Sequence, residues 1–226
     1  MALYDTGLLA RWFIDQAASG QTPLILADDT VNNEDLTITL DAANPTYSSV
    51  ATGRGLTFDS ASSTGLIQKL LGTGAIRTAL NGSTKAKLET VVDITSFTTA
   101  DDGFIIGVGG DGGYAPLLIY GSDGAGTLSF YNNMAGTGGP ISFSYDPEGA
   151  GRIVVQLVVD TTQATANYRV KMYVNDTQLT RSSTTGIPNQ NATLVVTTTH
   201  YAQLSNNPVS GTNGFVGSVY YGAMYS

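Results

Sequence analysis

The sequence predicts an all-β protein in which two antiparallel sheets stack as a sandwich. Apolar and polar residues alternate with period two along most of the 226 residues, and glycine-rich segments interrupt this alternation repeatedly. Period-two alternation is typical of strands with one buried and one solvated face. Roughly a dozen such strands, with turns about every 8–12 residues, favour a sandwich or a barrel.

Four segments alternate cleanly, and each is expected to form a strand: 36–41, 85–94, 141–146 and 168–175. In the last of these, Tyr168, Val170, Met172 and Val174 are expected to point inward, and Lys171 and Tyr173 outward. Two further segments, Phe104–Val108 and Ile153–Val159, are apolar on both sides. They predict central strands of the sheets.

Breakers rich in glycine and aspartate separate these strands, at 109–113, 121–124, 136–140 and 149–151. Both residues tolerate positive φ angles and therefore close hairpins. Only 74–80 predicts a helix, because Ile76 and Leu80 share one face and Asn81-Gly82 ends it. Neither a repeat nor a change in composition marks a linker, so residues 1–226 are expected to form a single domain.

Composition excludes several classes of function. The chain has 18 acids, 10 bases, no cysteine, one histidine and three glutamates. An acidic chain without basic runs is a poor nucleic-acid binder, and no apolar run approaches the roughly 18–20 residues of a membrane span. Disulfides and cysteine-based zinc sites are excluded. His200 is expected to be structural. No two of Glu34, Glu89 and Glu148 have the i, i+2 or i, i+4 spacing that would hold an acid and a base across a glycosidic bond.

Five motifs, taken in order, resemble those of a phage or bacterial laminin-G-like domain of the concanavalin A-like superfamily. They are 7–15, with Trp12 in an aromatic pair, the Asp/Asn loop 27–37, and segments 53–60, 170–176 and 215–225. The resemblance covers nearly the whole chain. It implies a jelly-roll β-sandwich with at most one or two short connector helices, and it implies that Trp12 is buried.

The sequence departs from the family in ways that bear on function. The strand at 152–154 lacks a Trp-His start, the turn Asn175-Asp176 lacks glycine, and Asn32-Asn33-Glu34 replaces an Asn-Gly turn. The glucanases and lyases of the superfamily carry Glu-x-Asp-x-x-Glu or Gln-x-His strands, and this sequence contains neither. We therefore expect no enzyme and no catalytic residues.

The resemblance implies one structural calcium ion and no other cofactor. The matching ligands are Asp28, Asp29, Asn32, Asn33 and Asp59, which supply the oxygens that calcium prefers. A second acidic group comprises Asp101, Asp102 and Asp111. The alternative is that all of these are ordinary solvated acids in turns.

Tyrosines near the glycine-rich hairpins are candidates for a glycan-binding rim: Tyr114, Tyr120, Tyr131 and Tyr145. Tyr220, Tyr221 and Tyr225 add aromatic side chains near the C-terminus. Sugars are held by aromatic faces and fixed polar groups, but tyrosine also packs well in strands. Either role is open for each residue.

These observations predict a non-catalytic structural or adhesive module on an extracellular particle, namely a decoration or tail-associated protein on the surface of a phage virion. The first residues lack a secretory signal pattern, as expected of a protein that is assembled in a cell and released by lysis. Expected partners are further copies, coat proteins and glycans. One alternative is a secreted bacterial carbohydrate-binding module separated from its signal or partner domains, and a more remote one is a polysaccharide hydrolase or lyase.

Overall fold

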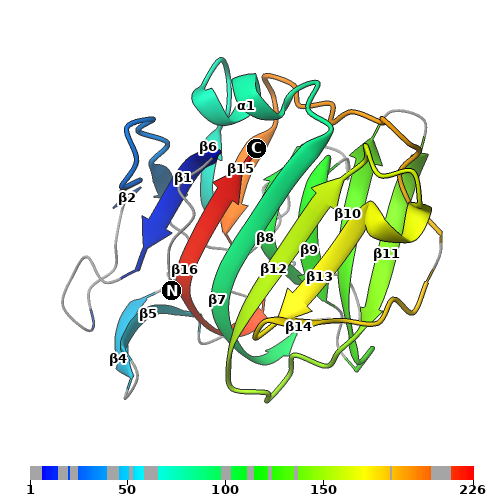
Figure 1. Ribbon diagram of the computed structural model, residues 1–226. Helices are drawn as coiled ribbons and strands as arrows, with labels where there is room; N and C mark the ends of the chain where they lie inside the picture. The colour runs from blue at the N-terminus through cyan, green and yellow to red at the C-terminus, as the bar shows by residue number, and fades with distance from the viewer. Residues whose placement is uncertain are drawn as a thin grey trace.

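The computed structural model describes residues 7–14, 20, 25–39, 46–50, 53–58, 66–97, 103–110, 115–121, 124–134, 137–183, 185–204 and 215–226. Its strands form two eight-stranded sheets, here called sheet A and sheet B, that stack as two layers (Figure 1). The all-β sandwich prediction is confirmed. The fold is a jelly-roll β-sandwich of the concanavalin-like type.

Sheet A contains, in order, β14 (Thr177–Gln178), β13 (Val170–Val174), β12 (Arg152–Asp160), β7 (Lys85–Phe97), β16 (Phe215–Tyr225), β5 (Gly53–Phe58) and β4 (Thr46–Val50). The first half of β16 pairs with β5, and its second half pairs with β1 (Leu8–Phe13). Both pairings are antiparallel. A register shift in β16 between Val219 and Tyr221 separates the two halves.

Sheet B contains, in order, β11 (Thr137–Ser144), β10 (Thr127–Met134), β9 (Leu117–Gly121), β8 (Gly103–Gly109), β15 (Tyr201–Leu204), β6 (Leu66–Leu70), β3 (Leu36–Thr39) and β2 (Ile25–Leu26). The expected breaker at 136–140 is wrong for most of its length, because it forms the start of β11. Pro140 is accommodated there because β11 is an edge strand, whose free side needs no N–H donor.

The core lies between the inner faces of the two sheets. The alternation predicted for β7 is confirmed, with Leu88 and Val92 fully buried. The strand expected at Ile153–Val159 is β12, which lies inside sheet A between β7 and β13, as predicted, and buries Leu157. Trp12 is also buried, as expected, and its indole N–H donates to the Glu34 carbonyl at 2.9 Å. The inward orientation expected for Tyr168 is wrong. It ends a short 3₁₀ helix, η1 (Ala166–Tyr168), ahead of β13 and is 57% exposed.

The predicted helix is confirmed as α1 (Ala75–Leu80), which buries Ile76 and Leu80. The Ile76 N–H at its N-terminus donates to the Glu34 carboxylate at 3.2 Å, which provides a partner for one of the free N–H groups of the first turn. In the described parts of the chain, no helix has both the length and the apolar character needed to cross a bilayer.

Candidate functional site

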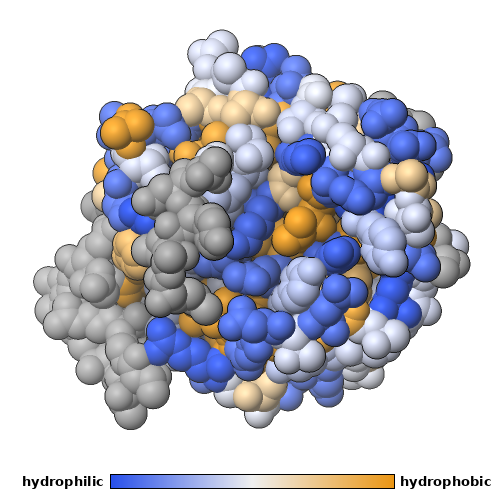
Figure 2. Space-filling view, in the orientation of Figure 1, coloured by the Kyte–Doolittle hydropathy of each residue, from blue (hydrophilic) through white to orange (hydrophobic). Residues whose placement is uncertain are grey.

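The outward-facing side of sheet A brings residues from distant parts of the chain into one row. The cross-strand register pairs Tyr225 of β16 with Lys87 of β7, Lys87 with Val158 of β12, and Val158 with Lys171 of β13. Directly opposed side chains in a sheet have Cβ atoms about 5 Å apart. We call these four residues the Tyr225–Lys171 row. Figure 2 shows small apolar patches on this face that are bordered by hydrophilic residues.

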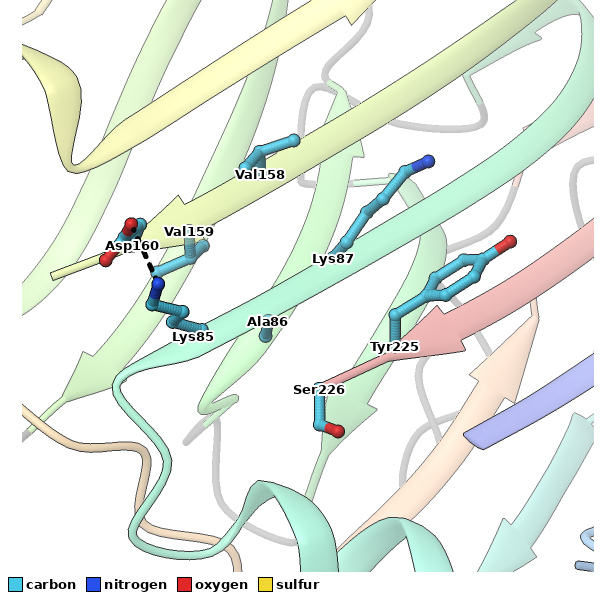
Figure 3. Close-up of a pocket in the computed structure, with 8 residues that line it drawn as sticks. All are labelled: Lys85, Ala86, Lys87, Val158, Val159, Asp160, Tyr225 and Ser226. Atoms are coloured by element: carbon cyan, nitrogen blue, oxygen red, sulfur yellow. Dashed lines mark ion pairs between the residues drawn. The ribbon is translucent and has the colours of Figure 1, made fainter. Parts of the chain in front are cut away.

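Two adjoining hollows lie along this row. The first has a volume of about 230 Å³ and is lined by Lys85, Ala86, Lys87, Val158, Val159, Asp160, Tyr225 and Ser226 (Figure 3). The second has a volume of about 300 Å³ and is lined by Val158, Asp160, Gln163, Tyr168, Lys171 and Tyr173. Val158 and Asp160 line both hollows, so the two form one continuous, ridged surface.

The lysines and tyrosines of this face lie in contact with each other. The Lys171 ammonium lies 5.3 Å from the centre of the exposed Tyr168 ring, and the Lys87 ammonium lies 5.0 Å from that of Tyr225. In Figure 3 the Lys87 and Tyr225 side chains stand side by side on neighbouring strands. Cations near ring faces hold both groups in place. Each hollow therefore offers an aromatic ring beside a hydrogen-bond donor.

Carboxylates next to the hollows have partners within the protein. The Glu89 Oε2 accepts hydrogen bonds from Lys87 at 2.6 Å and from Gln156 at 2.8 Å. Asp160 lies 3.4 Å from the Lys85 ammonium. Partial burial acts to raise the pKa of Asp160, but hydrogen bonds from Thr162 and Gln163 and the charge of Lys85 outweigh it and lower the pKa to about 2. Asp160 is therefore ionised at neutral pH.

Tyr221 and Tyr225 form a buried aromatic pair at the Tyr225 end of the row. Tyr221 and Tyr225 are 7% exposed, and their hydroxyl oxygens lie 3.4 Å apart. The Phe13 ring packs against Tyr221 at 5.3 Å between centres. Burial, the Tyr225 hydroxyl and the charge of Glu89 raise the pKa of Tyr221. Its phenol thus stays protonated, and the more exposed Tyr168 and Tyr173 remain the better contacts for a ligand.

The predicted calcium loop holds its shape through protein groups. The Asp28 carboxylate accepts from the N–H groups of Arg11, Thr30 and Glu34 and from the Thr30 hydroxyl, at 2.7–3.0 Å. Asp29 pairs with Arg11 at 2.7 Å. A carboxylate has about four acceptor positions, so Asp28 has used its capacity.

The remaining predicted calcium ligands are placed only in part. The Asn32 amide donates to the Leu9 carbonyl at 2.7 Å, and the Asn33 carbonyl accepts from Lys69 at 2.8 Å. Asp59, Asp101, Asp102 and Asp111 lie outside the described residues. Within those residues, no three His, Cys, Asp or Glu side chains gather as a metal site would. The calcium ion stays a prediction.

Of the tyrosines selected from the sequence, Tyr225 lines the first hollow, whereas Tyr120, Tyr131 and Tyr145 line neither. Tyr120 and Tyr131 lie on β9 and β10 of sheet B, where Tyr120 is 7% exposed and Tyr131 is half-buried. Tyr145 packs against the core, and burial together with Asp146 raises its pKa. Tyr114 lies outside the described residues. Their role in glycan binding stays a prediction.

Sequence reasoning missed the row itself. The outward orientations of Lys87, Lys171 and Tyr173 follow from their alternation and are confirmed. What the sequence lacks is a signal for register, which decides whether Lys87 and Lys171 meet across Val158 or lie at opposite ends of the sheet.

The histidine and the glutamates serve in separate places. His200 is 9% exposed, and its Nδ1 accepts the Thr197 N–H at 3.1 Å, in agreement with a structural role. The Glu34 carboxylate pairs with Lys69 at 2.8 Å. Glu148 accepts the N–H groups of Phe97 and Gly124. Each of these side chains is thus held in its own local network.

No protein-family model matches the sequence, and no curated protein is similar enough in sequence to count as a relative. Solved structures do resemble the fold. A Trypanosoma rangeli sialidase in complex with sialic acid matches with a TM-score of 0.60 at 16% identity, over 97% of this chain and 30% of that chain. The binding domain of Paraclostridial Mosquitocidal Protein 1 matches with a TM-score of 0.58 at 10% identity, over 97% of this chain and 48% of that chain.

A third similar structure is a small module. The CBM40 of the Ruminococcus gnavus IT-sialidase, bound to α2,3-sialyllactose, matches with a TM-score of 0.52 at 16% identity. The match covers 76% of this chain and 88% of that chain. This chain thus spans about a third of the sialidase and most of a binding module. At such low identity, the likeness defines a shared fold.

Proposed function

We propose that this protein is a non-catalytic, glycan-binding adhesive module that holds its ligand on the outer face of sheet A. The observation that carries the proposal is the pair of adjoining hollows on the Tyr225–Lys171 row, in which tyrosine rings lie beside lysine ammonium groups. Sugars present apolar ring faces and a dense set of hydroxyls, so they need aromatic surface together with fixed polar groups.

The similar structures support this proposal. One is a toxin's binding domain, and another is a module bound to a sialylated sugar. The second is covered over 88% of its length, which favours a function for the fold as a module by itself. Fold likeness alone is an analogy, and the two hollows are the stronger support for glycan binding.

A glycan array, followed by affinity measurements, tests the proposed site. Tyr173 faces outward on β13 and lines the second hollow, whereas Tyr131 lies on the other sheet. We expect Tyr173→Ala to weaken the best glycan about tenfold, which corresponds to roughly 1.4 kcal/mol. The matched control, Tyr131→Ala, should bind like the original protein once thermal unfolding shows that both variants fold.

Opposite outcomes are informative. Loss of binding in Tyr131→Ala, but not in Tyr173→Ala, would move the site to the tyrosines of sheet B that the sequence selected. An array without signal above background would overturn glycan binding. Release of reducing sugars from β-glucans, alginate or an array ligand would overturn the non-catalytic role.

We further propose that the protein is laminin-G-like in type and is displayed on a virion surface, as a decoration or tail-associated protein that assembles with copies of itself or with coat proteins. A chain without cysteine, with only 12% charged residues, suits a durable exposed β module. Antibody labelling of purified particles should decorate their surface. Recovery only from the particle-free medium would favour the alternative, a secreted bacterial carbohydrate-binding module, which the coverage of the CBM40 module supports.

A further inference from the structure

We propose that the ligand of the outer face of sheet A is an acidic glycan, whose carboxylate or sulfate pairs with Lys171. This inference rests on the proposed glycan-binding function and names the class of sugar. Three features of the molecule support it: the distribution of charge over the sheet, the ion pairs that Lys85 and Lys87 make and Lys171 does not, and the spacing along the Tyr225–Lys171 row.

The outer face of sheet A differs in charge from the chain as a whole, which has a net charge of −8. Side chains pointing outward from β1, β7, β12 and β13 include five cations and three carboxylates. The cations are Arg11, Lys85, Lys87, Arg152 and Lys171, and the carboxylates are Glu89, Asp93 and Asp160. An anionic ligand is repelled by the acidic remainder and attracted to this face.

Lys171 differs from the other two lysines of the hollows. Lys85 lies 3.4 Å from Asp160, and Lys87 lies 2.6 Å from Glu89. Within the part of the chain that the structure describes, no carboxylate pairs with Lys171, whose ammonium lies over the Tyr168 ring. A ligand anion at Lys171 therefore gains an ion pair without breaking one in the protein.

Asp160 lines both hollows, and the negative charge of its carboxylate acts against binding of an anionic ligand. It accepts hydrogen bonds from the Thr162 N–H, the Thr162 hydroxyl and the Gln163 amide, at 2.6–3.1 Å, in addition to its pair with Lys85. These donors offset its charge locally. The second hollow thus keeps Lys171 as a cation that is available to a ligand.

The spacing fits a chain of at least two sugars. Lys87 and Lys171 are separated by one strand, β12. With strands about 4.8 Å apart, their Cα atoms are roughly 10 Å apart. Val158 lies between them in the row. One sugar ring lies against Val158 and Tyr173 with its anionic group on Lys171, and the next extends toward Lys87 and Tyr225, whose donors bind neutral hydroxyls.

Paired probes that differ in charge test the inference. We would measure binding of 3′-sialyllactose against lactose, and of an oligogalacturonate against its methyl ester, by calorimetry at low and high salt. The acidic member of at least one pair should bind about tenfold more tightly, and added salt should remove this preference. Lys171→Gln should remove it too, so that the acidic member of the pair binds no more tightly than the neutral one.

Arg77→Gln is the matched control, because it removes one cation from α1, outside both hollows. It should leave the preference intact. Equal binding of acidic and neutral members, or an unchanged preference in Lys171→Gln, would overturn the acidic-glycan inference while glycan binding stands. If only neutral sugars bind on the array, the inference fails in the same way. If neither the array nor any probe gives binding, the proposed function itself fails, and this inference fails with it.

Discussion

The Asp28 loop and the outer face of sheet A both gather polar side chains, but they use them differently. In the loop, the Asp28 carboxylate accepts four hydrogen bonds from the protein and is 8% exposed. On the sheet, Lys87 is 31% exposed, and Lys171 has a ring as its neighbour. Residue types alone would mark the loop as the ligand site. The hydrogen-bond partners of Asp28 show that the loop connects structural elements. On the sheet face, by contrast, Lys171 can still pair with an anion of a ligand.

The largest effect should come from Asp28→Ala. This variant removes the acceptor for three backbone N–H groups and one hydroxyl. One of those N–H groups belongs to Glu34, whose carboxylate accepts the Ile76 N–H of α1 and pairs with Lys69. Leaving such buried donors unpaired should lower the free energy of unfolding by about 3 kcal/mol or more. Urea denaturation measures this directly. Asp28→Asn, which keeps part of the acceptor capacity, should lose less.

The comparison requires Lys171→Gln to behave oppositely. Lys171 is half-buried and pairs with no carboxylate among the described residues, so its replacement should change the free energy of unfolding by no more than about 0.5 kcal/mol. Its effect should appear in ligand binding alone. If urea denaturation gave Asp28→Ala as small a loss in the free energy of unfolding as Lys171→Gln, the hydrogen bonds of the loop would not be important for stability.

Lys69→Met should lower the free energy of unfolding somewhat less than Asp28→Ala does. The Glu34 side chain is 1% exposed, and Lys69 Nζ lies 2.8 Å from its Oε2. Removing the ammonium leaves a buried carboxylate with one N–H donor, which should cost roughly 2 kcal/mol because Lys69 itself is partly exposed. The double variant Lys69→Met/Glu34→Gln should recover part of this loss. An additive double variant would show that the two side chains are not coupled.

Much of this architecture follows from sequence pattern, because alternation reports which side of a strand is buried. It assigned the faces of β7 and β13 correctly, with Tyr168 as the exception, and a run that is apolar on both sides correctly predicted β12 as a strand inside its sheet. Pro140 shows a second limit: breaker composition suggested a loop, but an edge strand tolerates proline. The Tyr225–Lys171 row could not be predicted, since its members are 13 to 138 positions apart and meet only through register. Local pattern contains no information on which strands become neighbours.

A chelator experiment sharpens the same contrast with a small expected effect. Because protein donors already occupy the Asp28 carboxylate, EDTA and added calcium should each leave the melting temperature unchanged within about 1 °C. Anything that binds the native state stabilises it by mass action. A rise in melting temperature with calcium that chelator reverses would contradict this expectation and support the calcium ion predicted from the Asp/Asn loop.

The smallest effect of a substitution on stability at neutral pH is expected at His200, which also belongs to a structural network away from the hollows. Burial lowers its pKa from the usual 6.5, so the folded protein prefers the neutral ring whose Nδ1 accepts the Thr197 N–H. As the pH falls below about 6.5, the unfolded chain binds a proton that the folded chain resists. The stabilisation present above that pH is therefore lost progressively toward the folded pKa.

His200→Asn keeps an acceptor near Thr197 but cannot titrate, so its free energy of unfolding should fall less between pH 7.5 and pH 5.5. Equal slopes for the two proteins would show that His200 is not the group that titrates. Glycan affinity should stay unchanged in this variant, because His200 lines neither hollow.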